Sequence, residues 1–137
     1  MDGMGEPRIK IIAMPKDTNP AGNIFGGWIM SQIDIAGSLA AKDLNLERVV
    51  TVAVNLLEFK EPVFVGDILS CYAKILTVGN TSIKVQIEVN AERTIGSRRC
   101  IHVSSATITY VSVDKDGNKK PIECTLNQLK ALEIDKK

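Results

Sequence analysis

One stretch, Asn23 to Leu44, constrains the fold of this chain more than any other: NIFGGWIMSQIDIAGSLAAKDL. A glycine pair precedes a long apolar segment with a carboxylate, Asp34, in its middle. A helix from Gly26 to Leu44 would be about 28 Å long at about 1.5 Å per residue. In a chain of 137 residues such a helix crosses most of the domain, so we expect the rest of the chain to be built around it.

The predicted helix is apolar on two sides. At about 100° per residue, one wide apolar arc contains Ile29, Met30, Ile33, Ala36, Gly37, Ala40 and Leu44. Trp28, Ile35 and Leu39 fall on the opposite side. A helix of this kind is normally covered on both sides. We therefore expect the chain's own sheet on one side and a second layer, from another subunit, on the other.

Asp34 lies at the edge of the wide arc and shares its face with Ser31 and Ser38, by the i−3 and i+4 spacing. No Lys or Arg lies within one turn of it. Two interpretations are open. Asp34 either faces solvent or bonds the two serines, or it is a catalytic carboxylate at the edge of a cleft, where raised basicity is useful.

Asn23 and the pair Gly26-Gly27 favour the catalytic interpretation. The first amides of a helix have no partner within the helix and carry the positive end of its dipole, and glycine lets a ligand approach the backbone closely. This is a suitable site for a developing oxyanion. The competing interpretation is that the glycine pair is only a turn.

The remaining segments predict an α+β fold in a single domain over residues 1–137, with a core of about 8–122 and a tail of 123–137. Strands are predicted at 8–14, 48–59, 67–78, 83–90 and 101–113, and a short helix capped by Thr125 at 126–134, followed by a frayed end at 135–137. Short connections favour antiparallel pairing. A doubly wound fold is excluded because the crossover helices are missing.

Composition narrows the class of protein. A net charge of +1 gives no reason to expect nucleic acid or a membrane surface as a partner. Cys71, Cys100 and Cys124 are far apart without metal-ligand spacing, and we expect reduced thiols in a cytoplasmic protein and no metal site. No apolar run reaches the length of a membrane span, and the start lacks the features of a signal peptide.

Three blocks in order, AMPKDTNPAGNIFGGWIMSQIDIAG, RVVTVAVNLLEFKEPVFVGD and GNTSIKVQIEV, resemble the hotdog-fold acyl-CoA thioesterases, in particular the YciA-like group. The resemblance covers roughly residues 9–122. It implies an antiparallel sheet wrapped around one long helix, and two chains that join their sheets in one layer. It also implies an active site at their interface, a homodimer as the minimal active unit and a hexamer built as a trimer of dimers.

The resemblance also implies roles for single residues. Asp34 matches the catalytic aspartate, Asn23 the asparagine ahead of the glycine pair, and the Gly27 amide the oxyanion donor, with Asn23 and Asp34 of one site in different chains. Asp34 either activates water as a general base or attacks the thioester carbonyl to give a mixed anhydride. Both remain open, and we favour the base. Coenzyme A is part of substrate and product, so we expect no separate cofactor.

The phosphates of coenzyme A require cations near the mouth of the cleft. The candidates are Lys60, Arg98 and Arg99, although most of the seventeen Lys and Arg residues are expected to be merely solvated. Close approach of the ligand is expected at Gly26, and contact with pantetheine at the turn formed by Asn80, Thr81 and Ser82.

Two other functions compete with hydrolysis. A hotdog domain can serve as a non-catalytic acyl-CoA sensor, but such a regulator needs an output module and the sequence contains no helix-turn-helix or basic reader segment. A hydroxyacyl dehydratase needs a histidine together with its carboxylate. The single histidine, His102, lies in the predicted last strand, far along the chain from the helix motif.

Overall fold

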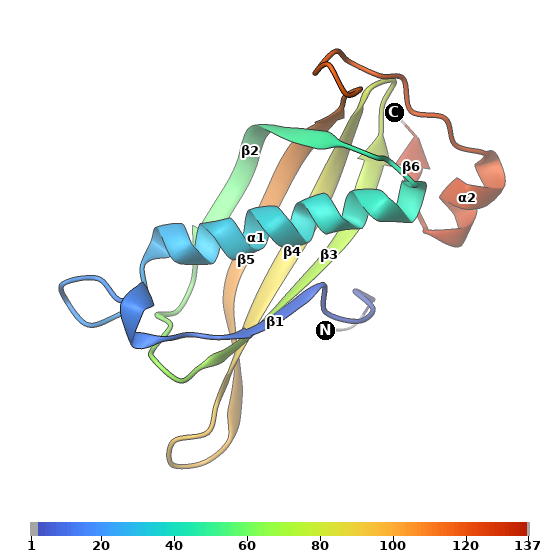
Figure 1. The fold of residues 1–137 in the computed structure, drawn as a ribbon. Helices are drawn as coiled ribbons and strands as arrows, with labels where there is room; N and C mark the ends of the chain where they lie inside the picture. Colours follow the sequence, from blue (N-terminus) through green and yellow to red (C-terminus); the bar gives the residue numbers. More distant parts are fainter. Residues whose placement is uncertain (1–2, 137) are drawn as a thin grey trace.

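The structure, a computed structural model, describes residues 3–136. One long helix lies across one face of a single curved sheet (Figure 1). The elements in chain order are β1 (Ile9–Ile12), the 3-10 helix η1 (Pro15–Asp17), α1 (Gly26–Ala40), the 3-10 helix η2 (Ala41–Leu44), β2 (Val49–Phe59), β3 (Ile68–Val78), β4 (Ser82–Arg93), β5 (Arg99–Ser112), α2 (Leu126–Ala131) and β6 (Asp135–Lys136). The predicted order of one strand, one long helix and four strands is therefore observed.

The sheet has the order β1-β3-β4-β5-β2, and all of these neighbours pair antiparallel. β2 and β3 follow each other in the chain but do not pair, because β2 lies beyond β5 at the far edge. The short strand β6 pairs parallel with the end of β3. The long helix thus connects the two edge strands, β1 and β2, and crosses the whole sheet between them (Figure 1).

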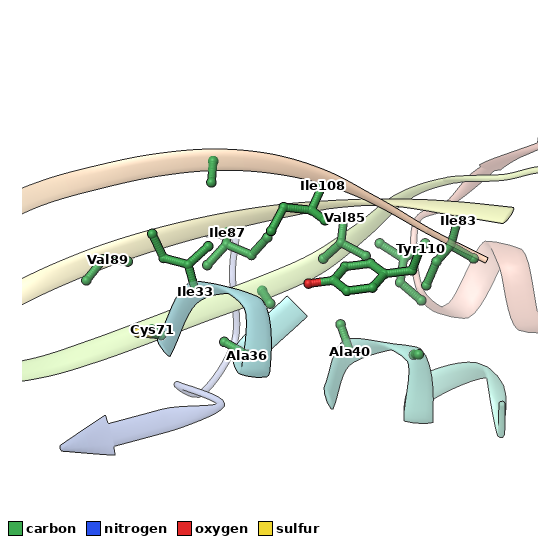
Figure 2. Close-up of a cluster of buried hydrophobic side chains, with 14 of the residues drawn as sticks. Ile33, Ala36, Ala40, Cys71, Ile83, Val85, Ile87, Val89, Ile108 and Tyr110 are labelled. Atoms are coloured by element: carbon green, nitrogen blue, oxygen red, sulfur yellow. The ribbon is translucent and has the colours of Figure 1, made fainter. Parts of the chain in front are cut away.

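The core lies between α1 and the central strands (Figure 2). On the helix, Ile29, Ile33, Ala36, Gly37 and Ala40 are buried, which confirms most of the predicted arc. The sheet supplies the alternate residues predicted to face inward; on β3 and β4 these are Leu69, Cys71, Ala73, Ile75, Ile83, Val85, Ile87 and Val89. Each fully buried aliphatic side chain contributes about 1.5–3 kcal/mol relative to an exposed one.

Several boundaries differ from the sequence predictions. The C-terminal helix α2 ends at Ala131 and not at 134, and the bounds of β1, β4 and β5 shift by one to three residues. The α-helix ends at Ala40 and continues only as a 3-10 turn, which closes at Asn45 with a left-handed φ of 58°. The end at 135–136 is not frayed, because Asp135 and Lys136 pair with Thr77 and Val78 of β3. Nothing in the sequence indicated this pairing, because these two polar residues show no apolar periodicity.

The segment predicted as a tail contributes to the core. Thr125 caps α2 as predicted, since its side chain accepts a hydrogen bond from the Gln128 amide at 3.1 Å. Leu129 and Ile134 are 4% and 8% exposed and belong to the main cluster. No helix among residues 3–136 has both the length and the apolar character needed to cross a membrane.

The edge strand β2 contrasts with the rest of the sheet. Every residue of β2 after Val49 is exposed. Its large apolar side chains are uncovered, and they are Val50, Val52, Val54, Leu56, Leu57 and Phe59. Within the described chain, β2 pairs only with β5, so its other edge is open. An open, apolar edge strand is a surface that pairs readily with another strand.

Candidate active site

The loop before α1 holds Asn23 in place through its backbone. Asn19 donates its amide to the Asn23 carbonyl at 2.7 Å, and its Oδ1 accepts from the Asn23 amide at 3.1 Å. The next residue, Ile24, donates its amide to Val63 on the loop between β2 and β3 at 3.0 Å. Within residues 3–136 the side-chain amide of Asn23 makes no hydrogen bond, so it is available to a ligand.

A cleft of about 280 Å³ opens at this end of the helix. Its walls are the loop before α1 and the end of β2, and its lining includes three of the residues predicted from the sequence: Asn23, Gly26 and Lys60. The Phe59 ring lies over Gly26, where an added Cβ would be 3.5 Å from the ring. The loop before α1 and the end of β2, which are far apart in the chain, therefore line the same cleft.

The first turn of α1 leaves two amides free. Phe25 is the N-cap, and its carbonyl accepts from the amides of Trp28 at 3.1 Å and Ile29 at 3.2 Å. For the amides of Gly26 and Gly27, no acceptor is found in the part of the chain that the structure describes. Gly27 is exposed, and a Cβ added to it would meet nothing within 4 Å. These amides point out of the start of the helix, where its dipole is positive.

Asp34 is half-buried and is held by two hydroxyl groups from the sheet. Thr51 donates its Oγ1 hydrogen to Asp34 Oδ1 at 2.7 Å. The Tyr110 hydroxyl lies 3.1 Å from the same Oδ1 and 2.9 Å from the Asp34 carbonyl oxygen. Thr51 and Tyr110 are directly opposite each other on β2 and β5. A cross-strand pair thus converges on the carboxylate from the face of the sheet that carries α1.

The two serines predicted on the face of Asp34 do not bond it. Ser31 donates to the carbonyl of Trp28 and Ser38 to the carbonyl of Ile35, each at 2.7 Å. Serine in a helix often bonds the backbone of the preceding turn in this way. The interpretation in which Asp34 bonds the serines is therefore wrong, and two residues distant in sequence take that place.

Tyr110 was missed by the sequence analysis, although a signal for it exists. It is fully buried, and burial together with the charge of Asp34 raises the pKa of its hydroxyl far above the ordinary value. The group therefore stays protonated and acts as a donor. Gly37, one helical turn after Asp34, makes room for it, because a Cβ there would lie 2.9 Å from Tyr110 Cζ. A glycine inside a long helix suggests such a close approach.

The free amides and Asp34 are separated along the helix. Asp34 follows Gly27 by about two turns, which is about 10 Å at about 1.5 Å per residue. The amides point away from the helix body, so an oxyanion bonded to them lies still farther from Asp34 of the same chain. A single carbonyl group therefore cannot contact both the free amides and the Asp34 carboxylate of one chain.

The other predicted site residues lie apart. Asn80, Thr81 and Ser82 are at one end of β4. Arg98, the last residue of the connection to β5, and Arg99, the first residue of β5, are at the other end. Twelve residues of strand separate these ends by roughly 36 Å at about 3.3 Å per residue. Arg98 forms an ion pair with Glu92, whereas Arg99 is exposed. Of the three predicted cations, Lys60 alone is among the residues that line the cleft.

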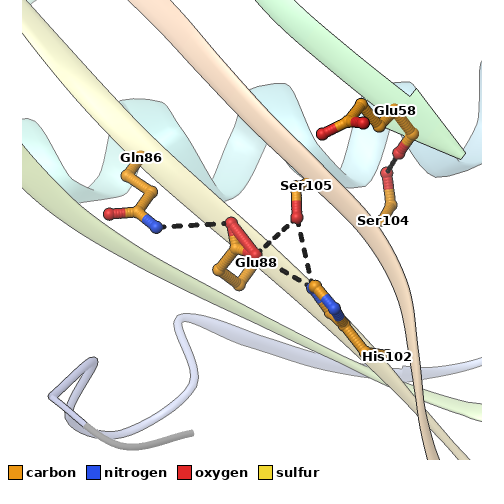
Figure 3. A network of polar contacts seen from close by, with 6 residues as sticks. All are labelled: Glu58, Gln86, Glu88, His102, Ser104 and Ser105. Carbon is orange, nitrogen blue, oxygen red and sulfur yellow. Dashed lines mark hydrogen bonds and ion pairs between the residues drawn. The ribbon is translucent and has the colours of Figure 1, made fainter. Parts of the chain in front are cut away.

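His102 lies on the opposite face of the sheet from α1. Val85, Ile87 and Val89 of β4 face the helix, so the intervening Glu88 faces away from it. Glu88 Oε1 lies 2.9 Å from His102 Nε2 and accepts the Ser105 hydroxyl hydrogen at 2.5 Å (Figure 3). The serine proton is thus directed to the glutamate. The sheet separates this histidine from Asp34, and residues 3–136 contain no cluster of three metal-ligating side chains.

Similar proteins agree with this architecture. The model of the thioesterase superfamily matches residues 21–96, which include the whole of α1 and β2. A hexameric hotdog-fold thioesterase of Campylobacter jejuni has 57% identity and a TM-score of 0.88, over 96% of this chain and 98% of that one. The hotdog fold predicted from the resemblance is confirmed.

Two further relatives have named activities. The acyl-CoA thioester hydrolase YciA of Salmonella typhimurium is 46% identical over 122 residues, 86% of this chain and 90% of that protein. A hexameric broad specificity acyl-coenzyme A thioesterase has 40% identity and a TM-score of 0.83, over 97% of this chain and 92% of that one. The chain belongs to the thioesterase superfamily, and the predicted likeness to the YciA group is confirmed.

Proposed function

We propose that this protein hydrolyses acyl-CoA thioesters to a free acid and coenzyme A, with Asp34 as the group that acts at the thioester carbonyl. The observation that carries the proposal is a half-buried carboxylate without a cationic partner among the described residues, held at one oxygen by Thr51 and Tyr110. The substrate class is supported by the relatives with 40% and 46% identity, an acyl-coenzyme A thioesterase and an acyl-CoA thioester hydrolase.

In the proposed reaction Asp34 accepts a proton from water as the water oxygen attacks the thioester carbon. The carbonyl oxygen becomes an oxyanion and accepts a hydrogen bond from the Gly27 amide, while the side-chain amide of Asn23 orients the water or the substrate. The C–S bond then breaks, and the thiolate of coenzyme A takes up the proton. The alternative is attack by Asp34 itself, which breaks the C–S bond, releases the thiolate of coenzyme A and forms a mixed anhydride; water then hydrolyses the anhydride to the free acid and restores Asp34. Neither route needs a further cofactor.

The proposed site takes Asp34 from one chain and Asn23 with Gly27 from its partner. Within one chain the free amides point away from Asp34, and the distance along the helix is about two turns. The exposed apolar edge of β2 supplies a surface on which two chains can associate. β2 also carries Thr51, so association there would act directly on the surroundings of Asp34.

The minimal active unit is accordingly a homodimer, and the hexameric state of the Campylobacter relative supports a trimer of dimers. Lys60 at the cleft is the nearest candidate for the phosphates of coenzyme A. Arg98, Arg99 and the turn Asn80–Ser82 lie at opposite ends of β4, so at most one of these groups serves the cleft of the same chain. The free thiols at positions 71, 100 and 124 suit a cytoplasmic location.

The test is release of coenzyme A thiol from acyl-CoAs of increasing chain length, with wild type beside Asp34→Ala. The variant is expected to retain its fold and to lose turnover, whereas full activity in Asp34→Ala contradicts the assignment. Binding without thiol release in the wild type supports the acyl-CoA sensor instead. Conversion of a 3-hydroxyacyl thioester to its enoyl form supports the dehydratase.

The oxyanion role has its own matched pair of variants. Gly27→Pro removes the amide hydrogen at a first-turn position where proline is tolerated. Gly27→Ala keeps that hydrogen and adds a Cβ into open space. We expect kcat to fall by about 100-fold or more in the proline variant, as for other oxyanion donors, and to change little in the alanine variant. Equal activities contradict the role.

A further inference from the structure

The two oxygens of the Asp34 carboxylate have different surroundings. Oδ1 accepts from Thr51 at 2.7 Å and lies 3.1 Å from the Tyr110 hydroxyl. For Oδ2, no donor is found among residues 3–136. A carboxylate with one oxygen bonded twice cannot rotate freely about its last torsion, so the free oxygen points in one direction. Only Oδ2 has lone pairs available to water or substrate.

Tyr110 fixes the backbone of Asp34 as well as its side chain. The hydroxyl lies 2.9 Å from the Asp34 carbonyl oxygen, and its single hydrogen is shared between this oxygen and Oδ1. The ring is fully buried in the core beneath α1, so it has one available position (Figure 2). Because the ring is rigid and its hydroxyl contacts both the carbonyl oxygen and the carboxylate of Asp34, the position of β5 fixes the position of the carboxylate.

The fold makes special room for this contact. Gly37 lies one turn after Asp34, and any side chain there would overlap the Tyr110 ring and hydroxyl. Thr51 is the cross-strand partner of Tyr110, so the two donors arrive from adjacent strands at the same register. α1, β2 and β5 therefore meet at one carboxylate oxygen.

We infer that Tyr110 is a positioning residue, which together with Thr51 holds Asp34 Oδ1 and thereby directs Oδ2 at the reacting atoms. The inference rests on the proposed role of Asp34. It is the same whether Oδ2 takes a proton from water or attacks the carbonyl, since both need that oxygen in a fixed direction. Tyr110 itself, buried below the helix, does not touch the substrate.

The test is steady-state thiol release by Tyr110→Phe, with Tyr72→Phe as the control. Phenylalanine keeps the ring in the core and removes only the hydroxyl, and Tyr72 lies on β3 outside the core cluster. We expect kcat of Tyr110→Phe to fall at least about tenfold, the effect of losing a hydrogen bond to a charged group, while KM stays within twofold. A kcat equal to wild type, or a rise in KM that accounts for the loss, overturns the inference.

A second pair of variants tests the hydrogen bond that Thr51 on β2 donates to Asp34 Oδ1. Thr51→Val removes the hydroxyl at constant shape, and Thr51→Ser retains it. We expect kcat to fall in the valine variant and to recover in the serine variant. Asp34→Ala distinguishes a failure of the proposed function from a failure of the positioning role of Tyr110. Full activity in Asp34→Ala refutes the proposed function, whereas an inactive Asp34→Ala beside a fully active Tyr110→Phe refutes only the positioning role.

Discussion

β4 and β2 have similar sequence patterns and opposite surroundings. Both are strands of eleven or twelve residues in which apolar side chains alternate with others. In β4 the apolar residues Ile83, Val85 and Ile87 are at most 1% exposed beneath α1, whereas in β2 the apolar residues Val52 and Val54 are 54% and 44% exposed. Alternation therefore predicts a strand and its apolar face, but it does not predict what covers that face.

The difference has a functional consequence. β4 is paired on both edges and serves the core of its own chain. β2 is paired on one edge only, and it also carries Thr51, which holds Asp34. We propose that β2, whose second edge is unpaired, joins two chains. The same association would bring Asn23 and Gly27 of one chain to Asp34 of the other.

The largest expected effect on stability is in β4. Ile87→Ala removes a fully buried side chain and should lower the free energy of unfolding by about 2–5 kcal/mol. Ile95→Ala, at a position that is 78% exposed, should change it by less than about 0.5 kcal/mol. Urea unfolding followed by circular dichroism, at one fixed protein concentration because association shifts apparent stability, measures both. Equal effects would contradict the assignment of β4 to the core.

A charge in β2 should act on association and not on the fold of the chain. Val54→Glu is expected to leave the circular dichroism spectrum unchanged and to shift the protein to smaller species in light scattering, because a carboxylate is costly to bury in an interface. Thiol release should fall with it. Asn118→Glu adds the same charge in an exposed turn and should change neither property. If Val54→Glu assembles like the wild type, β2 does not form the interface between chains.

The smallest expected effect is a difference in thiol chemistry. Cys71 on β3 is completely buried, and burial raises its pKa to about 12, so almost no thiolate is present at pH 8. Cys100 at the start of β5 is exposed. With an alkylating reagent at pH 8, Cys71 should react only after denaturation, and peptide mapping by mass spectrometry identifies the modified residue. Labelling of native Cys71 at the rate of Cys100 would contradict its burial.

Much of the fold could be predicted from the sequence because the period of the apolar residues distinguishes helix from strand and identifies the apolar face of each element. The start of α1 at Gly26, the inward residues of β3 and β4 and the antiparallel α+β arrangement were all predicted correctly. The position of β2 beside β5 was not predicted. A short connection between β2 and β3 suggests that these strands pair, whereas in the structure they are separated by β4 and β5. The pairing of β6 was missed because two residues are too few for a pattern.

The site was predictable only in its local part. Asn23, Gly26 and Lys60 meet at one cleft, and Asn23 with Gly26 are neighbours in the chain. The partners of Asp34 are 17 and 76 positions away, and only tertiary structure brings such residues together. The roles predicted for Asp34, Asn23 and Gly27 stay predictions until kinetics test them.

The most direct test of a site shared between two chains is complementation between Asn23→Ala and Asp34→Ala. Each variant alone is expected to be inactive. When the two are unfolded together and refolded in equal amounts, about half of the dimers are mixed, and each mixed dimer has one intact site and one doubly altered site. We therefore predict thiol release at about a quarter of the wild-type rate.

The double variant Asn23→Ala/Asp34→Ala, refolded with wild type, is the matched control. In a shared site each mixed dimer lacks one group at both sites, so only wild-type dimers work and about a quarter of the activity remains. A site contained within one chain predicts the reverse: no recovery in the first mixture and about half of the activity in the second. That pair of results would contradict the account.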